Sequence, residues 1–382
     1  MDEAFTPKKR MLNAYRGIAS DRYAVAPEFW YYFPAKKLGL SMMEFEREVP
    51  FWQSLQQVFK MYGCEGWGTI FPEIHRDSVK RSVNFIRTDE HNYREETNWF
   101  YNGNEFTSLK AFHDTEPSWV LKHPANPSDL PLMLDMLFCP ENEVQFAEMT
   151  AAHQKVGDDY LLEVWVGLPF FDFIAELIGF EPAILYFYDE EESVLEEYRR
   201  RYLAHQLNFL KQCIVGTDFE SYVIGCSYSC NSLLGAQMWR QWDKPYIKEI
   251  ARFLHENGKL LHIHFHGKCM ETLDDFVETG VDCICPFERP PGGDVIGLEG
   301  LSEVRRKLDE KVTVNGNIHT VETLIRGTPS DVRREIDELS AAFKGSARLI
   351  IGTGDQVGHE TKDENLAEMI EYGKKIRVAI KV

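Results

Sequence analysis

The sequence lacks long apolar runs and has few basic residues. No window approaches the ~18 consecutive apolar residues of a membrane-spanning helix, and no basic segment followed by an apolar stretch stands at the start. Lys and Arg number 42 against 61 Asp and Glu, which gives a formal net charge of −19, and no basic run is longer than Arg199-Arg200-Arg201. Such a charge repels polyanions. We therefore expect a cytoplasmic protein with no membrane and no nucleic-acid partner.

Cysteine is also sparse, and several nucleotide and hydrolase motifs are absent. Eight cysteines in 382 residues are too dilute for a disulfide scaffold and suit a reducing compartment. No GxGxxG, Walker or GxSxG motif occurs, which disfavours nucleotide binding and serine hydrolysis. Hydrophobic residues make up 44% of the chain, enough for a core, and we expect one domain over residues 1–382.

Short apolar segments alternate with amphipathic helices through much of the chain. The helices are expected at 244–258, at 328–345 and from 363 onward, each with end signals such as Pro in the first turn or Gly after the last. The alternation predicts a parallel sheet, and the number of elements fits a (β/α)8 TIM barrel whose active residues lie at the strand C-termini. Strands are expected at 23–26, 161–166, 221–225, 259–264, 281–285, 312–315 and 349–351.

Residues 81–106 break this rhythm. Polar and aromatic residues alternate there around the turn signal Asn102-Gly103, which predicts an antiparallel hairpin insert. We interpret it as a flap near the barrel mouth, and an edge hairpin that only covers core is the alternative.

Three histidines occupy alternate positions in the segment 261–269, so they share one face of an extended strand. Imidazole is a ligand of Zn, Fe, Ni and Cu, and His264 and His266 are the first-choice metal ligands. His262 lies deeper and is expected to be a packed, hydrogen-bonded core histidine. The competing interpretation is that all three are structural.

Neighbouring strand ends offer the further metal ligands. Glu288 follows the expected strand 281–285, and Asp355 follows the last strand. Cys283 or Cys285 could bind as a thiolate and favour zinc, but buried strand cysteines are more often small core residues, so they rank below the carboxylates.

Polar residues also follow the expected strand 312–315. The Asn-Gly-Asn turn places Asn317 and His319 at the barrel mouth, where they are predicted, with Lys268, to be catalytic, unless this is a plain strand-to-helix turn. Aromatic residues are predicted to line a substrate pocket, unless they are core: Trp30, Tyr31, Tyr32, Trp67 and Phe287.

Several segments resemble the uroporphyrinogen decarboxylase superfamily, with a similarity that runs from about residue 6 to 376. They are 6–17, 21–27, the His-x-His-Gly at 264–267, 280–282, 316–318, 327–329 and 364–366. The resemblance implies a (β/α)8 barrel with its site at the strand C-termini. The superfamily comprises decarboxylases and cobalamin-linked methyltransferases, and a less characterised subgroup shares the His-x-His-Gly-Lys pattern.

Two departures bear on the reaction. The decarboxylases carry an arginine-rich stretch after the first strand, but residues 27–33 here contain no arginine, so a polyanionic porphyrinogen is disfavoured. The methyltransferases bind zinc through His-x-Cys and a later Cys, whereas this chain has His264-x-His266 and Asp355 at the similar positions. A metal ion bound by two imidazoles and a carboxylate is a stronger Lewis acid than one bound by thiolates.

We therefore expect a metal-dependent enzyme, with Zn²⁺ as the favoured divalent ion. The preferred reaction moves a methyl group from a small O- or N-methylated substrate to a corrinoid on a partner protein, because this chain has no Asp-x-His-x-x-Gly cobalamin segment. The alternatives are a decarboxylase acting on a porphyrinogen or smaller acid, for which a cation such as Lys268 should point into the pocket, and a non-catalytic binder. A homodimer is compatible with the sequence, which does not fix the oligomeric state.

Overall fold

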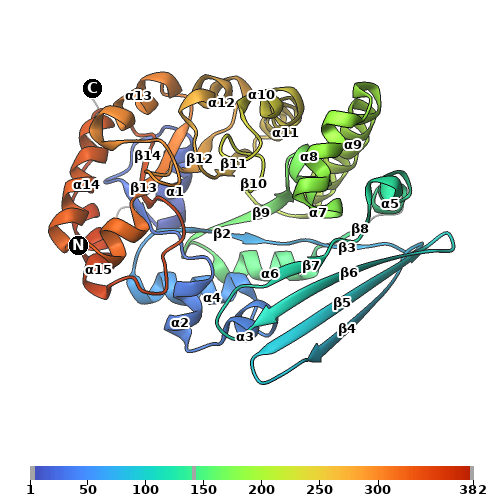
Figure 1. Ribbon diagram of the computed structural model, residues 1–382. Coiled ribbons are helices and arrows are strands. Elements are labelled where there is room, and N and C mark those ends of the chain that lie inside the picture. Colours follow the sequence, from blue (N-terminus) through green and yellow to red (C-terminus); the bar gives the residue numbers. More distant parts are fainter. Residues whose placement is uncertain (1–4, 140–142, 379–382) are drawn as a thin grey trace.

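A curled sheet of eight parallel strands forms the centre of the computed structural model, which describes residues 5–139 and 143–378 (Figure 1). The strand order is β1-β14-β13-β12-β11-β10-β9-β2. The predicted α/β class and TIM-barrel type are confirmed. The strands are β1 (Ala24–Ala26), β2 (Trp67–Ile70), β9 (Leu161–Gly167), β10 (Ser221–Cys226), β11 (Leu260–Phe265), β12 (Cys283–Pro286), β13 (Thr313–Ile318) and β14 (Leu349–Thr353).

All seven parallel strands expected from the sequence are present, and β2 is the one that was missed. Nearly every strand residue is buried, as expected where helices cover the outer face of a sheet and side chains fill its interior. The register pairs His264 of β11 with Cys285 of β12 and with Gly225 of β10, which brings these positions to one level of the sheet.

The sheet has a seam between β1 and β2, which no ladder joins in the part of the chain that the structure describes. The side chain of Glu65 fills part of this seam. Its carboxylate accepts hydrogen bonds from the backbone N–H of Val25 (2.9 Å) and from the guanidinium groups of Arg10 (3.0 Å) and Arg22 (2.7 and 2.9 Å). A buried ion network therefore replaces the backbone pairing there.

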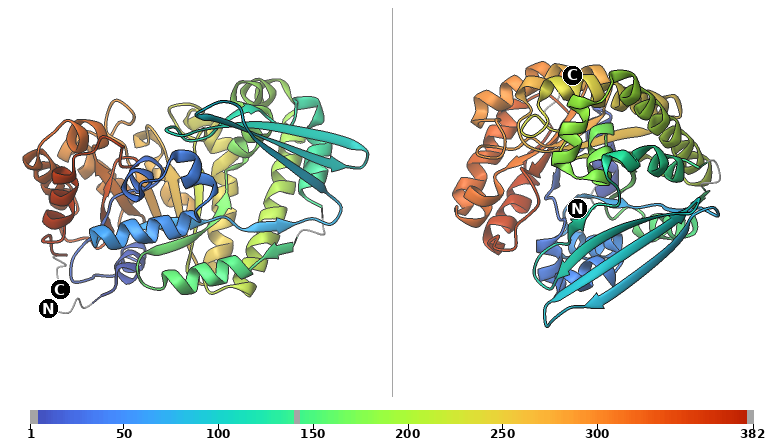
Figure 2. Two further views of the ribbon diagram at one scale, coloured as in Figure 1. Left: turned by 90° about the horizontal axis from the view of Figure 1, so that it is seen from below. Right: turned by 45° about the vertical axis from the view of Figure 1, so that its right-hand side comes forward.

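Helices surround the sheet, with the C-terminal half forming the most regular strand-helix succession (Figures 1 and 2). The expected helices at 244–258, 328–345 and from 363 correspond to α11, α14 and α15. The helices are α1 (Pro7–Tyr15), α2 (Tyr32–Leu38), α3 (Met42–Arg47), α4 (Phe51–Tyr62), α5 (Leu130–Leu137), α6 (Ala147–Val156), α7 (Phe170–Ile178), α8 (Phe180–Asp189), α9 (Glu192–Gly216), α10 (Ala236–Met238), α11 (Lys244–Glu256), α12 (Leu273–Thr279), α13 (Gly297–Leu308), α14 (Pro329–Ala342) and α15 (Asp363–Gly373), with shorter turns η1 (Pro127–Asp129), η2 (Trp239–Asp243), η3 (Met270–Thr272) and η4 (Thr320–Ile325).

The antiparallel insert is confirmed and is larger than the predicted hairpin. Its strands follow the order β4-β5-β6-β7, and Asn102 and Gly103 form the β5–β6 turn, both with positive φ. The sheet packs beside α3, with Arg47 over the ring of Phe85 (4.1 Å to the centroid). Its strands are β4 (Lys80–Arg87), β5 (Asn92–Tyr101), β6 (Asn104–His113) and β7 (Trp119–Lys122), and β3 (Glu73–His75) pairs separately with β8 (Glu143–Gln145).

Among the helices in the described ranges, none combines the length and the apolar character needed to cross a membrane.

Candidate functional site

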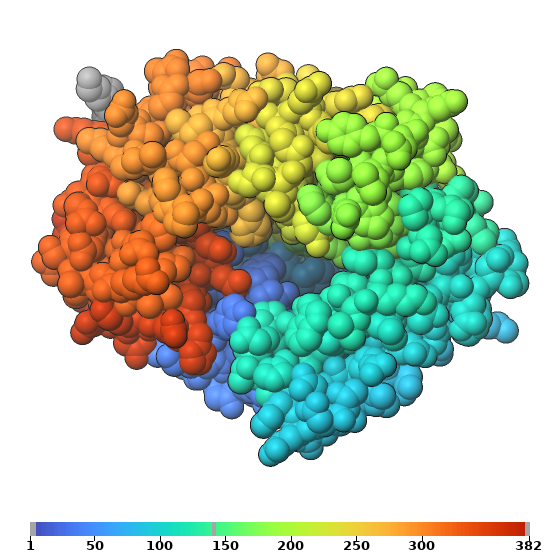
Figure 3. Space-filling model, in the orientation of Figure 1, coloured from blue at the N-terminus to red at the C-terminus, as the bar shows by residue number. Residues whose placement is uncertain are grey.

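A cavity of about 340 Å³ lies at the carboxyl ends of the parallel strands. Figure 3 shows a hollow on the viewed face, bordered by N-terminal, middle and C-terminal segments. This is where a barrel of this type places its active site. The residues lining the cavity are Glu28, Trp30, Tyr31, Trp67, Phe71, Trp165, Leu168, Gly225, Ser227, His264, His266, Asp355 and Gln356.

The three histidines of β11 and its end occupy successive depths. His262 is fully buried, with Nδ1 2.9 Å from Oε2 of Glu163 and Nε2 3.1 Å from Sγ of Cys285. The prediction that His262 is a hydrogen-bonded core histidine is confirmed. His264 and His266 line the cavity, and their Nε2 atoms are 2.8 Å apart.

His264 directs its other ring nitrogen toward two acidic groups. Its Nδ1 lies 3.0 Å from Sγ of Cys285 and 3.9 Å from Oε2 of Glu28. Donor atoms of Glu28, His264 and Cys285 all lie within 4.8 Å of one another, which makes these residues a candidate metal-ligand group. Glu28 comes from the loop after β1, so the group joins three separate strands of the sheet.

The separations fit a zinc ion. Zinc bonds of about 2.0 Å to nitrogen and oxygen and about 2.3 Å to sulfur, at tetrahedral angles, place neighbouring donor atoms roughly 3.5 Å apart. Burial raises the pKa of Glu28 to about 8, with a further rise from the charges of Asp355 and Glu288. Burial also raises the pKa of Cys285 well above its usual value and lowers that of His264. Protonated Glu28 and Cys285 would lose their protons when a cation binds, whereas His264 would bind as a neutral imidazole.

His266 is held from its other side by Glu288. Its Nδ1 is 3.0 Å from Oε1 of Glu288, which also accepts from the backbone N–H of Gly267 (2.8 Å). Burial would lower the pKa of His266, but the hydrogen bond to Glu288 and the charges of Asp355 and Glu28 raise it to about 9. Glu288 thus contacts the ring nitrogen of His266 that faces away from His264. A carboxylate in this position orients the imidazole and does not itself bind a metal ion held on the other side of the ring.

Asp355 lines the cavity, as its predicted place after the last strand requires. Its Oδ1 accepts from the backbone N–H of Gln356 (2.6 Å), and burial raises the pKa of the carboxyl group. Asp355 falls outside the group of donors that could share one ion, whereas Glu28, which the sequence interpretation overlooked, belongs to it. Ligand roles for Asp355 and Glu288 stay predictions.

The three predicted catalytic residues lie outside the cavity lining. His319 begins η4, where Nδ1 accepts from the N–H groups of Val321 and Glu322 and Nε2 contacts the Pro290 carbonyl (3.0 Å). Asn317 is buried. Lys268 is exposed. His319 therefore makes the contacts of a helix cap, and catalytic roles for the three residues stay predictions without support from this geometry.

Aromatic side chains form much of the cavity wall. Trp30 stacks on His264 at 6.5 Å with an interplanar angle of 13°, and Trp67 lies 5.3 Å from Trp30. Trp30, Tyr31 and Trp67 line the cavity as predicted for substrate-binding residues, whereas Phe287 is buried and does not. Trp165, a wall residue that the sequence interpretation missed, stands on β9 among apolar neighbours, so no local signal marks it.

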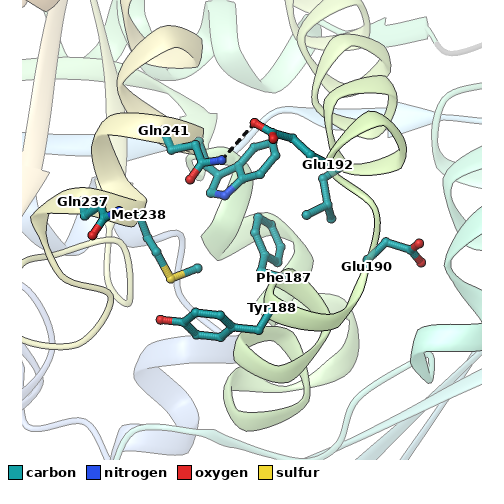
Figure 4. Close-up of a pocket in the computed structure, with 9 residues that line it drawn as sticks. Phe187, Tyr188, Glu190, Glu192, Gln237, Met238 and Gln241 are labelled. Atoms are coloured by element: carbon teal, nitrogen blue, oxygen red, sulfur yellow. Dashed lines mark hydrogen bonds between the residues drawn. The ribbon is translucent and has the colours of Figure 1, made fainter.

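Another cavity, of about 280 Å³, lies between α8, α9 and the α10–η2 segment (Figure 4). Phe187, Tyr188 and Met238 face it, and its polar contact is the hydrogen bond from Gln241 to Glu192 (3.1 Å). It contains neither a histidine nor a cysteine, so it offers no comparable group for catalysis.

Known proteins similar to this chain agree with its fold. Over 185 residues it is 29% identical to uroporphyrinogen decarboxylase 1, chloroplastic, from Oryza sativa subsp. japonica, a match that covers 46% of this chain and 39% of the rice protein. The chain thus matches well under half the length of that curated relative. A methyltransferase from Methanosarcina mazei superposes with a TM-score of 0.60 and 14% identity, covering 97% of this chain and 98% of that one, which shows a shared fold.

The family relationship rests on a longer segment. Residues 148–376 match the uroporphyrinogen decarboxylase (URO-D) family, a range that includes six of the eight parallel strands and both cavity histidines. This match spans more than half of the sequence, and the chain belongs to the uroporphyrinogen decarboxylase family.

Proposed function

We propose that this protein is a metal-dependent methyltransferase that moves a methyl group from a small O- or N-methylated compound to a corrinoid carried by a partner protein. The observation that carries the proposal is the convergence of Glu28, His264 and Cys285 beside an aromatic-walled cavity at the strand C-termini. The methyltransferase neighbour supports the fold needed for this chemistry.

Glu28, His264 and Cys285 would hold the ion, with Zn²⁺ the best match to an oxygen, nitrogen and sulfur donor set. When bound, it would supply Lewis-acid polarisation of the substrate oxygen or nitrogen. Trp30 and Trp67 supply a flat apolar wall for the methylated compound.

We infer that His266 delivers a proton to the leaving group. It lines the same cavity, and the hydrogen bond between its Nδ1 and Glu288 (3.0 Å) supports an imidazole that can carry a proton. When the methyl group leaves for the corrinoid, the electron pair of the broken bond would stay on the substrate oxygen or nitrogen. A proton from His266 then completes the alcohol or amine, and solvent reprotonates the imidazole.

Decarboxylation receives less support from the cavity. A carboxylate that reacts in this cavity needs a cation beside it, yet no Arg or Lys occurs among the described residues that line the cavity, which include Glu28 and Asp355. Lys268, the cation that would have favoured a decarboxylase, is exposed outside this lining.

Metal analysis tests the ligand set. We expect about one equivalent of zinc in the purified wild-type protein and loss of most of it in His264→Ala and Cys285→Ser. Cys283→Ala is the matched control, because Cys283 is buried two positions earlier on the same strand but lies outside the ligand group. Full metal content in all three variants would refute the assignment.

A second assay tests the reaction itself. Zinc-loaded protein incubated with free cob(I)alamin and a panel of methoxy and N-methyl compounds should form methylcobalamin, followed by its absorption spectrum. Cys285→Ser should abolish this while Cys283→Ala retains it. Absence of methylcobalamin with every compound would count against methyl transfer.

A further inference from the structure

A third cavity, of about 400 Å³, adjoins the cavity that contains His264 and His266; we call these two the outer and the inner cavity. The two share Trp30, Tyr31 and Phe71, so these three aromatic residues line both cavities where they meet. The outer wall is the antiparallel insert, which contributes Arg81, Glu95, Lys110 and Phe112, and α3 and its surroundings supply the rest: Phe45, Glu46, Arg47 and Phe51.

The charges of the two cavities differ in sign. The inner cavity contains the carboxyl groups of Glu28 and Asp355 and neither Arg nor Lys among its described lining. The outer cavity contains three cations, Arg47, Arg81 and Lys110, against two carboxylates. In a chain with a net charge of −19, this local positive excess stands out from the surrounding field.

Both carboxylates of the outer cavity already have partners. Glu95 pairs with Arg47, whose guanidinium lies over the rings of Phe85 and Phe112, and Glu46 accepts from the backbone N–H of Ser118 (3.1 Å). These contacts pair Arg47 with Glu95 and hold Glu46 in place, although the charge of Glu46 is not neutralised by the backbone N–H.

Lys110 and Arg81 are the cations that remain. Within the described ranges, neither has a carboxylate at ion-pairing distance. Lys110 lies in the same cross-strand row as Phe85 and Glu95, half-buried, with Nζ 5.3 Å from the centre of the Phe112 ring. Its ammonium group therefore faces an aromatic cavity with hydrogen-bonding capacity unused.

We infer that the outer cavity binds a carboxylate group of the substrate through Lys110, with Arg81 adding to the positive charge around it, while the methylated end of the same molecule lies in the inner cavity. The side chains that line the outer cavity have a net charge of +1, which matches a monoanion better than a dianionic phosphate. The substrate class is thus a methylated, mainly apolar monocarboxylic acid. The position of the methyl group rests on the proposed function, whereas carboxylate binding does not.

Binding of two isosteric probes tests this inference without any turnover. The dissociation constants of 4-methoxybenzoate and 4-methoxybenzamide are measured by calorimetry with the full-length protein at low salt. We expect the acid to bind about fivefold more tightly than the amide, the size typical of a partly solvated charge pair, and the difference to shrink in 0.5 M NaCl. In Lys110→Met, the acid should lose this advantage while the amide binds as before.

Lys80→Met is the matched control, because Lys80 is exposed on the same sheet but alternates to the opposite face from Arg81. It should retain the preference for the acid. Equal binding of acid and amide by the wild type, no saturable binding of either, or an equal loss of preference in both variants would overturn the inference, and tighter binding of 4-methoxyphenyl phosphate would overturn the assignment to a monoanion. None of these results depends on metal or corrinoid, so failure of methyl transfer is a separate outcome.

Discussion

Replacing Glu65 by Gln should destabilise the protein substantially, because its carboxylate lies between two buried guanidinium groups at the β1–β2 seam. The side chains of Glu65, Arg10 and Arg22 are 1%, 0% and 4% exposed. Removing one partner of a buried ion pair costs about 3–5 kcal/mol. Asp21 still accepts two hydrogen bonds from Arg10 (2.8 and 2.9 Å), so we expect the lower end of this range, about 3 kcal/mol.

The loss can be measured by urea denaturation followed by tryptophan fluorescence. At an unfolding entropy of about 2 cal/mol/K per residue, a loss of about 3 kcal/mol lowers Tm by roughly 4 °C. Glu197→Gln is the control, because Glu197 pairs with Arg200 on the surface of α9 (2.7 Å) and should cost under about 1 kcal/mol. If the two variants differ by less than about 1 kcal/mol, the seam does not depend on the charge of Glu65.

Three further predictions concern a buried carboxyl group outside the cavity and two residues at the site. Burial raises the pKa of Asp243 from 3.8 to about 7, so the folded state keeps a proton that the unfolded chain loses, and stability falls between about pH 4 and pH 7 and then levels off; Asp243→Asn should flatten that decline in Tm measured between pH 4 and 8. Glu288→Gln removes the carboxylate bonded to His266, so the pKa of His266, measured by NMR titration, should fall below about 9. A Cβ at Gly225 would lie 2.4 Å from the Trp165 ring, so Gly225→Ala should displace that indole and weaken 4-methoxybenzamide binding severalfold in calorimetry.

The fold could largely be predicted from sequence because its later strands are short apolar runs separated by capped amphipathic helices. The strand β2 was missed because Trp67–Ile70 includes a glycine and is followed by the insert instead of a helix. The insert was placed by its Asn-Gly turn, but β7 lies beyond the alternating segment, so only part of this sheet was expected.

The histidine pair could be predicted because alternate residues of one strand share a face, a rule that needs no tertiary knowledge. Glu28 could not, because it stands in a loop more than 200 residues away and reaches His264 only through the curvature of the sheet. Glu288 was predicted at the correct strand end. The structure shows that it contacts Nδ1 of His266, on the side away from His264, and sequence position alone does not determine which ring nitrogen a carboxylate contacts.

The ligand group expected from the sequence and the candidate group in the structure differ, and this difference changes the expected metal. Two histidines and one carboxylate form a set that also suits iron(II), whereas a thiolate with one histidine and one carboxylate favours zinc and disfavours magnesium or calcium. Cys285 lies between His262 and His264, 3.1 and 3.0 Å from their ring nitrogens, so its sulfur is held in place before any ion arrives. Zinc selectivity in this site would therefore come from β12, and iron should replace zinc more readily in Cys285→Asp than in the wild type.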